Sequence, residues 1–416
     1  MCSMPAAGAP GRAGAAPESA SAALERASAA LERARALAPV LRKRSAAANE
    51  ARRVPDETVR DLLDAGLFKL LQPRRFGGAE QDLDVFARAA IELARGCGSA
   101  GWVFSVLSIH QWMLALFPEE AQHDVWGADP DALVASALRP SAGTAEREEG
   151  GYRIGGTWGF ASGVENSQWM ILGVFVPAGV GPEPGSRELK MMLMPTSEGR
   201  VDDNWRVMGL RGTGSKNFVC DNAFVPDHRV LAFQAAKAGE GPGRALNAAP
   251  LYAVPAFACL ALCVACPGVG AASGAYQRFI EYVATRRSVA QKNVADYATV
   301  QLRVAEAAAM IDAAEALLVG GCRRVMETAR SGRGFTLEER ARFRRDQGYA
   351  ARTSADAAEK LLRACGAAAL FDDFEIRQCY LDAWATASHI GCSWDLVATQ
   401  FGQVAMGGQP EPLAWV

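Results

Sequence analysis

The sequence predicts an α+β fold in which a small β-domain lies between two helical regions. Helical periodicity dominates residues 22–129, short β-prone runs separated by Gly and Pro fill residues 130–238, and an alanine-rich helical pattern occupies residues 239–416. We expect an N-terminal helical domain, a central antiparallel β-barrel and a C-terminal helical bundle. Residues 1–21, rich in Ala, Gly, Pro and Ser, are expected to form a disordered tail.

An apolar stripe marks the first helix of the N-terminal region. Its residues recur at steps of three and four: Leu24, Ala27, Leu31, Ala34, Ala38 and Leu41. A later helix, Trp102–Leu116, is apolar nearly all round, which predicts a place at the centre of the fold. His110 interrupts this apolar helix.

Glycine-spaced segments are the most informative part of the β-region. Residues 150–163 are predicted to form a strand, a glycine turn and a second strand that runs into Phe160-Ala161-Ser162-Gly163. Residues 208–215 are predicted to form a tight glycine loop before another strand, Asn217–Pro226. Because glycine has no Cβ, such segments let backbone amides approach a flat ligand closely.

Composition excludes several classes of protein. With a formal net charge of −2 and half of its residues hydrophobic, the chain lacks the basic excess of a nucleic-acid-binding protein. No run reaches the roughly 18 uninterrupted apolar residues of a membrane span, so no membrane partner is expected. Ten cysteines include a CxxC at Cys263 and Cys266, but these lie at helical spacing in an apolar run. We therefore expect packed thiols, no metal site and a reducing cytoplasm.

These segments together resemble the acyl-CoA dehydrogenase superfamily, and in particular its oxygenase branch, the two-component (group D) flavin-dependent monooxygenases. Two helical motifs extend the resemblance: Tyr282-x-x-x-Arg286 followed by Gln301, and Arg377-x-x-x-x-Asp382-Ala. Val289 stands where dehydrogenases usually carry Phe. The resemblance covers nearly the whole chain and implies the helix–sheet–helix architecture expected above.

The resemblance implies a diffusible reduced flavin, FAD or FMN, that reacts with O2 and comes from a separate NAD(P)H:flavin reductase. Ser162 is expected to hydrogen-bond flavin N5 as a catalytic group. Arg286 is expected to reach a flavin phosphate across a subunit interface, which implies a homotetramer. The candidate flavin contacts are Trp158, Phe160, Ser162, Arg211, Thr213 and Arg286. The loop at residues 208–215 matches neither GxGxxG nor a P-loop, so a Rossmann site is not expected.

Two of the four histidines are candidate catalytic residues. His110, on the apolar helix, and His389, late in the bundle, match the positions of substrate-pocket histidines in phenol-hydroxylating family members. We expect His389, with a pKa near neutrality, to act as the base that generates a phenolate, and His110 to orient the substrate. From the residues alone, a buried histidine that only packs is the commoner case. The candidate substrate contacts are Trp112, Ser136, Tyr252 and Phe257, for which core packing is an equal explanation.

The reaction is inferred from the residues at the two positions where dehydrogenases of the family carry their catalytic base. No glutamate follows Asp382 where dehydrogenases carry their late base, and Pro255–Cys266 contains no acidic residue. The resemblance therefore favours hydroxylation of a phenol- or indole-like substrate through a C4a-hydroperoxyflavin. N- or S-oxygenation, as in nitrososynthase-like or thiophene-sulfur oxidase-like relatives, is the alternative. An acyl-CoA dehydrogenase and a non-catalytic scaffold of the same fold are less favoured.

Overall fold

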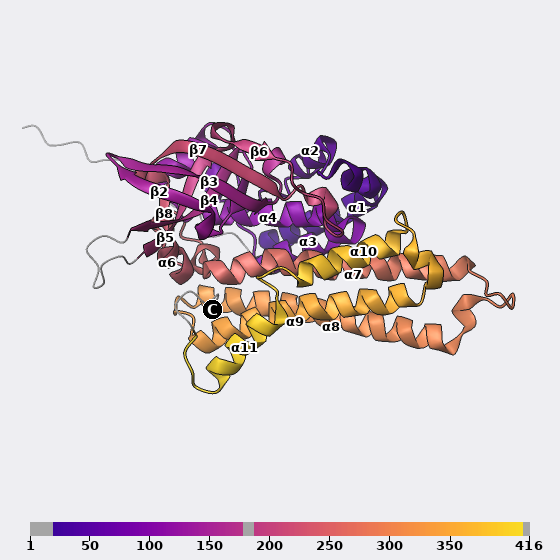
Figure 1. Ribbon diagram of the computed structural model, residues 1–416. Coiled ribbons are helices and arrows are strands. Elements are labelled where there is room, and N and C mark those ends of the chain that lie inside the picture. The colour runs from indigo at the N-terminus through magenta and orange to yellow at the C-terminus, as the bar shows by residue number, and fades with distance from the viewer. Residues whose placement is uncertain (1–19, 178–186, 411–416) are drawn as a thin grey trace, which may run out of the picture.

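The computed structural model describes residues 20–177 and 187–410. Helices, two β-sheets and a second group of helices follow one another along the chain, so the predicted α+β fold is confirmed (Figure 1). The first helix begins at Ala20, which makes residues 20 and 21 helical; residues 1–19 of the predicted tail lie outside the described part. The N-terminal helices are α1 (Ala20–Ala51), α2 (Asp56–Asp64), α3 (Leu83–Gly96), α4 (Gly98–Leu114) and α5 (Glu119–Gln122).

The β-domain consists of two four-stranded sheets, ordered β1-β4-β5-β8 and β2-β3-β7-β6. Its strands are β1 (Val134–Ala137), β2 (Gly143–Glu148), β3 (Gly151–Ala161), β4 (Trp169–Pro177), β5 (Arg187–Pro195), β6 (Arg200–Asp202), β7 (Lys216–Pro226) and β8 (Val230–Ala232). All neighbours pair antiparallel except β1 and β4, which are parallel. The predicted antiparallel barrel is thus realised as two packed sheets with one parallel pair.

The predicted glycine turn within residues 150–163 is wrong, because β3 is one continuous strand. Its glycines lie at a β-bulge, where the pairing with β7 shifts register between Ile154 and Gly156. A Cβ on Gly156 would lie 2.4 Å from the carbonyl oxygen of Ala142. Glycine is therefore needed here for close strand packing and not for chain reversal.

Trp158 of β3 fills the space between the two sheets. The side chain is fully buried, and its indole N–H donates to the carbonyl oxygen of Gly173 on β4 across 3.0 Å. A Cβ on Gly143 would lie 2.0 Å from the Trp158 ring, so β2 must pass the indole with a glycine. This tryptophan holds the two sheets at their observed separation.

Helix α4 is buried along its whole length, as its apolar sequence predicts. It packs against α3 on one side and against α7 on another. Near the β-domain, Gly163 turns against this helix with φ +70°, and a Cβ there would lie 3.3 Å from both Val103 and Leu107. Because residues 103, 107 and 110 share one helix face, this contact sets His110 toward the β-domain.

The C-terminal bundle is built around α7 and α9. Its helices are α6 (Phe233–Ala238), α7 (Ala256–Thr285), α8 (Ala298–Arg330), α9 (Leu337–Arg363), α10 (Glu375–Ala387) and α11 (Trp394–Ala405). Figure 1 shows α7 between the N-terminal helices and the layer of α8 and α9. Helix α9 begins at a capping box, in which Thr336 and Glu339 each accept the other's backbone N–H.

Helix α7 is also the one described helix with the length and apolar composition of a membrane span. The stretch Ala258–Thr285 meets both criteria, but its most apolar window is entirely buried against other helices. All nine cysteines in the described part of the chain are free thiols, and eight are buried. Burial raises the pKa of the thiols of Cys259, Cys263 and Cys266 on α7, which keeps them protonated and packed.

The first prediction concerns the tryptophan between the sheets. Trp158→Phe removes the indole N–H that pairs with Gly173 and leaves a gap, so the free energy of unfolding is expected to fall by about 2–3 kcal/mol. Tyr152→Phe, a half-buried position on the same strand, is the control and should change it by less than about 0.5 kcal/mol. Chemical denaturation followed by far-UV circular dichroism measures both. Equal stability of the two variants would contradict the assigned role of Trp158.

Candidate active site

Trp102, near the start of α4, joins three parts of the chain. Its indole N–H donates to Ser162 Oγ at the end of β3 across 3.0 Å. Its ring packs edge-on against the imidazole of His389, with 5.6 Å between ring centroids. One tryptophan thus brings together Ser162 of the β-domain and His389 of the bundle, which are 227 positions apart in sequence.

A row of buried hydroxyl groups continues from Ser162. Ser162 Oγ lies 2.7 Å from Ser215 Oγ, which lies 2.7 Å from Thr213 Oγ1. Thr213 Oγ1 in turn donates to the carbonyl oxygen of Leu210 across 2.8 Å. Thr213 belongs to the 3-10 turn η6 (Arg211–Thr213), and Ser215 comes directly before β7, so the predicted glycine loop supplies two of the three hydroxyls.

Leu210, at the end of this row, has the left-handed conformation with φ +53°. This conformation is costly for a residue with a branched side chain, and neighbouring contacts must maintain it. Asp382 on α10 does so, since its Oδ1 accepts the backbone N–H of Leu210 across 2.7 Å and a side-chain N–H of Gln378 across 2.7 Å. Burial raises the pKa of Asp382 to about 6, despite these hydrogen bonds and nearby Arg278.

Buried His110 and half-buried Ser136 form a second pair with defined hydrogen positions. His110 Nδ1 lies 2.8 Å from the carbonyl oxygen of Val134, which can only accept, so Nδ1 carries the proton. The other nitrogen, Nε2, then accepts the hydroxyl hydrogen of Ser136 on β1 across 2.9 Å. Burial lowers the pKa of His110 to about 4, and the imidazole is neutral at pH 7.

His389 follows the end of α10 and has the opposite tautomer. Its Nδ1 accepts the backbone N–H of Gly391 across 3.0 Å, which leaves the ring proton on Nε2. Burial, and secondarily the nearby charge of Arg344, lower the pKa of His389 to about 4. The near-neutral pKa expected from the sequence is therefore not found for this histidine. At pH 7 its Nε2–H is a hydrogen-bond donor.

Phe160 supplies a flat apolar wall beside the hydroxyl row. It has φ +63°, and 68% of the residue is exposed, with its ring edge-on to Trp205 at 6.0 Å. A phenylalanine held in a left-handed conformation and left open to solvent is unusual in both respects. An exposed ring next to a polar hydroxyl edge fits the apolar face and polar rim of an isoalloxazine ring, so these residues suit a flavin.

Arg211 lies where two surface hollows meet. One hollow, of about 390 Å³, is lined by Arg52, Arg206, Val207 and Arg211. Arg52 is paired with Asp203, and the guanidinium groups of Arg206 and Arg211 suit an anionic group such as a phosphate. Arg286 is far from this loop along the fold: it caps the end of α7 and stacks over Tyr282 at 5.2 Å. Figure 1 shows the α7–α8 connection at the end of the bundle away from the strands.

Several expected ligand contacts are instead core residues. Trp158 packs between the sheets, Trp112 donates its indole N–H to the Leu251 carbonyl, and Tyr252 donates its hydroxyl to the Leu71 carbonyl. All three are fully buried, because each indole or phenol finds a backbone partner within the fold. The structure gives them packing roles. Phe257 falls within α7, but its side chain lies outside what the structure describes.

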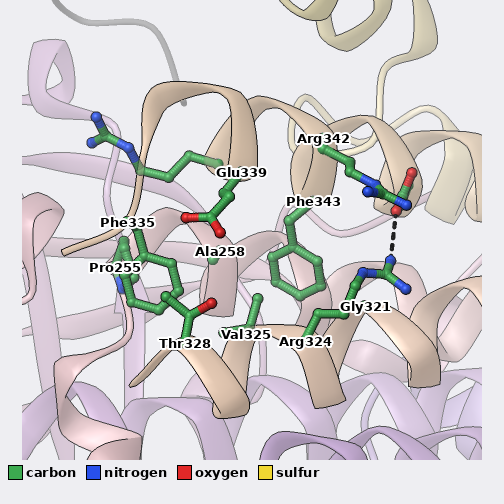
Figure 2. Close-up of a pocket in the computed structure, with 12 residues that line it drawn as sticks. Pro255, Ala258, Gly321, Arg324, Val325, Thr328, Phe335, Glu339, Arg342 and Phe343 are labelled. Carbon is green, nitrogen blue, oxygen red and sulfur yellow. Dashed lines mark hydrogen bonds and ion pairs between the residues drawn. The ribbon is translucent and has the colours of Figure 1, made fainter. Parts of the chain in front are cut away.

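A separate small cavity lies in the bundle and contains none of the predicted site residues. Its volume is about 110 Å³. Figure 2 shows it between α8 and α9, with Val325, Phe335 and Phe343 around it. Arg324 pairs there with buried Asp346 across 3.2 Å. The paired charges and apolar walls make it a gap between helices that could hold a few waters.

Two family models match most of the helical sequence: the acyl-CoA dehydrogenase N-terminal domain over residues 25–129 and its C-terminal domain over residues 262–394. Together they cover more than half of the 416 residues. The protein thus belongs to the acyl-CoA dehydrogenase family, and its relatives place it in the branch of flavin-dependent monooxygenase oxygenase components. The resemblance inferred from the sequence is confirmed.

Among these relatives, the FADH2-dependent resorcinol hydroxylase oxygenase component of Rhizobium sp. (strain MTP-10005) is 39% identical over 90% of this chain and 93% of its own. The flavin-dependent monooxygenase oxygenase subunit HsaA of Rhodococcus jostii (strain RHA1) is 36% identical over 85% of this chain and 92% of its own. The crystal structure of 3-HSA hydroxylase from Rhodococcus sp. RHA1 superposes with a TM-score of 0.88, at 35% identity, over 93% and 98% of the two chains. XiaF from Streptomyces sp., in complex with FADH2 and glycerol, gives 0.84 at 28% identity over 94% and 98%.

Sequence reasoning brought Ser162, His389, His110 and Ser136 forward as site residues but missed Trp102. A tryptophan that opens an apolar helix gives no signal of its own, because apolar helices commonly contain buried tryptophans. What could have drawn attention to it is its spacing of eight residues from His110, about 12 Å along one helix. Only the contacts of its indole with two distant segments reveal its place.

The second prediction concerns the buried carboxyl of Asp382. Its pKa is raised from 3.8 to about 6, so it favours the folded state below pH 4 and loses this effect as pH rises through 6. Asp382→Asn keeps an oxygen acceptor without the charge. Relative to wild type, its free energy of unfolding should therefore rise between pH 5 and pH 7.5, by about 1.4 kcal/mol. Urea denaturation at several pH values measures this. Asp373→Asn, at an exposed position, is the control, and a difference independent of pH for Asp382→Asn would contradict the prediction.

Proposed function

We propose that this protein hydroxylates a phenol- or indole-like aromatic substrate with reduced FAD or FMN and O2, the flavin coming from a separate NAD(P)H:flavin reductase. The observation that carries the proposal is the junction at Trp102, which brings Ser162 beside Phe160 and His389 to one place. Relatives support the substrate class, since they include resorcinol, p-hydroxyphenylacetate and indole-3-acetate oxygenases. A bound reduced flavin would supply the electrons that activate O2.

The chain's own residues would hold the flavin from three sides. Phe160 would lie along the ring, Ser162 would hydrogen-bond its N5 edge, and the turn with Arg211 and Thr213 would flank it. Arg286 stands at the far end of α7 in its own chain, so it would serve the flavin of a neighbouring copy. This arrangement supports a homotetramer, and a diffusible flavin and buried free thiols support a cytoplasmic location.

The hydrogen positions favour roles for His110 and His389 that differ from those expected from the sequence. Ser136 donates to His110 Nε2, so its remaining lone pairs can accept a substrate hydroxyl, and the proton can pass through Ser136 to His110. His389, protonated on Nε2, would donate to the same oxygen and stabilise negative charge on it. A phenolate beside His110 would raise that histidine's low pKa, because an adjacent anion favours the imidazolium.

Dehydrogenation of an acyl-CoA finds less support. It needs a carboxylate near the flavin, and the late segment of the bundle presents His389 there. Asp382, seven residues earlier, has its carboxylate turned to the Leu210 N–H and Gln378. An acid that is already bonded in this way is poorly placed to take a substrate proton.

A rapid-mixing experiment tests the proposal. The protein is loaded with reduced FAD or FMN without oxygen and mixed with O2 and a panel of phenols, indoles, amines and sulfides. Substrate-dependent formation of a hydroxylated aromatic product is the expected result. If only amines or sulfides are oxygenated, the activity is N- or S-oxygenation and not aromatic hydroxylation. Failure to bind either reduced flavin would overturn the proposal.

The third prediction separates the two proton paths. Ser136→Ala breaks the path to His110, so hydroxylation of a phenol should slow by about 10²-fold or more at pH 7. The rate should recover as pH approaches the substrate's own pKa near 10, because the substrate then arrives as phenolate. Single-turnover product yields between pH 6 and 10 measure this.

Ser108→Ala is the matched control for this prediction. It removes a buried hydroxyl on α4 for which the structure shows no hydrogen-bond partner among the described residues, so it should leave the rate unchanged. If Ser136→Ala retains full coupling at pH 7 while His389→Ala loses it and recovers at alkaline pH, His389 is the base.

A further inference from the structure

The direction of every hydrogen bond in the row from Ser162 to Leu210 is fixed by its last member. The carbonyl oxygen of Leu210 has no hydrogen, and it lies 2.8 Å from Thr213 Oγ1, so the threonine hydroxyl must donate to it. Leu210 cannot turn this oxygen away, because Asp382 holds its N–H and the indole N–H of Trp205 also donates to the same carbonyl.

The remaining directions follow from the number of protons. Thr213 has given its only hydroxyl hydrogen to Leu210, so across the 2.7 Å contact Ser215 must be the donor. Ser215 has then used its own hydrogen, so across the next 2.7 Å contact Ser162 must be the donor. The three hydroxyl protons thus account for all three contacts among the four oxygens. Each proton points along the row toward Leu210, away from the place proposed for the flavin.

Ser162 is thereby left with acceptor capacity only. Its hydrogen points to Ser215, and one lone pair takes the indole N–H of Trp102 across 3.0 Å. A hydroxyl oxygen has two lone pairs, so one remains for a ligand. Both Ser162 and Ser215 are buried, so bulk water does not offer an alternative partner to either hydroxyl.

Flavin N5 changes its hydrogen-bond character with redox state. In reduced flavin N5 carries a hydrogen and donates; in oxidised flavin N5 has only a lone pair and accepts. An acceptor at this place is satisfied by the first form and opposed by the second. We propose that Ser215 and Thr213 are positioning residues that hold Ser162 as an acceptor and so make the site select reduced over oxidised flavin. This inference rests on the proposed function, with Ser162 facing N5.

Selectivity of this kind would suit a protein whose flavin arrives by diffusion. The reduced form must bind before it meets O2 in solution, and the oxidised product must leave for the next cycle. When oxidised flavin binds, N5 and Ser162 would face each other with lone pairs only. This should weaken the binding of oxidised flavin by about tenfold or more. The row of hydroxyls would therefore discriminate between the two redox states of flavin, although none of its members gains or loses a proton.

The test compares the dissociation constants of oxidised and reduced FAD and FMN for the full-length protein. Oxidised flavin is titrated by fluorescence quenching, and reduced flavin by absorbance under anaerobic conditions. Wild type is expected to favour the reduced form. In Ser215→Ala the hydroxyl of Ser162 loses its acceptor and can turn to N5 of oxidised flavin, so the ratio of the two constants should fall at least tenfold. By linkage, tenfold lowers the two-electron potential of the bound flavin by about 30 mV.

Three further variants make the result decisive. Ser215→Thr keeps a hydroxyl in the row and should keep the wild-type ratio, and Thr213→Val, which removes the proton that sets the row's direction, should lower it. Ser167→Ala is the matched control, because it deletes a nearby buried hydroxyl that donates to the Gly163 carbonyl outside the row. Its ratio should equal that of wild type. Melting temperatures identify any variant that fails to fold, in which case Thr213→Val stands in for Ser215→Ala.

The outcomes separate this inference from the proposed function. If the protein binds neither reduced FAD nor reduced FMN, both the inference and the proposed function are overturned. A protein that binds reduced flavin and hydroxylates its substrate, but whose ratio is the same in Ser215→Ala, Thr213→Val and wild type, overturns the inference alone. So does a wild type that binds both redox states equally.

Discussion

Burial of α4 on all sides is the constraint on which the site depends. A large polar group on such a helix avoids the cost of burial by bonding to another element, since water is not available. Trp102 finds Ser162, and His110 finds Val134 and Ser136, so the helix connects to the β-domain at two places. The hydrogen bonds that relieve the cost of burying these groups are the same ones that define the site.

Burial also decides the protonation states around the pocket. It lowers the pKa of both His110 and His389 to about 4, so two neutral imidazoles face the site at pH 7. Because the two neutral rings are opposite tautomers, His110 can accept a proton through Ser136, and His389 can donate its Nε2–H. Hydrogen bonds are stronger away from water, so the burial of His110 strengthens the one that Ser136 donates to it.

Local pattern was enough to predict the fold, whereas Ser162, His110 and His389 were nominated through the family resemblance. Helical and strand periodicities are written in neighbouring residues, which is why α4 and β7 appear where the sequence places them. The bulge in β3 was mistaken for a turn because glycine serves both, and only the pairing with β7 distinguishes them. Tautomers, hydroxyl directions and the packing of large aromatic side chains depend on partners far away in sequence. No local pattern of residues encodes them.

The contact between Asp382 and Leu210 joins residues that are 172 positions apart. During synthesis the N-terminal helices and both sheets emerge well before α10, and domains generally fold in that order. The early chain can therefore build the wall with Phe160 while Leu210 is held by Trp205 alone and not yet by Asp382. The last hydrogen bond that fixes Leu210 forms only when the bundle docks, so an unfinished chain has the wall without its complete hydrogen-bond pattern.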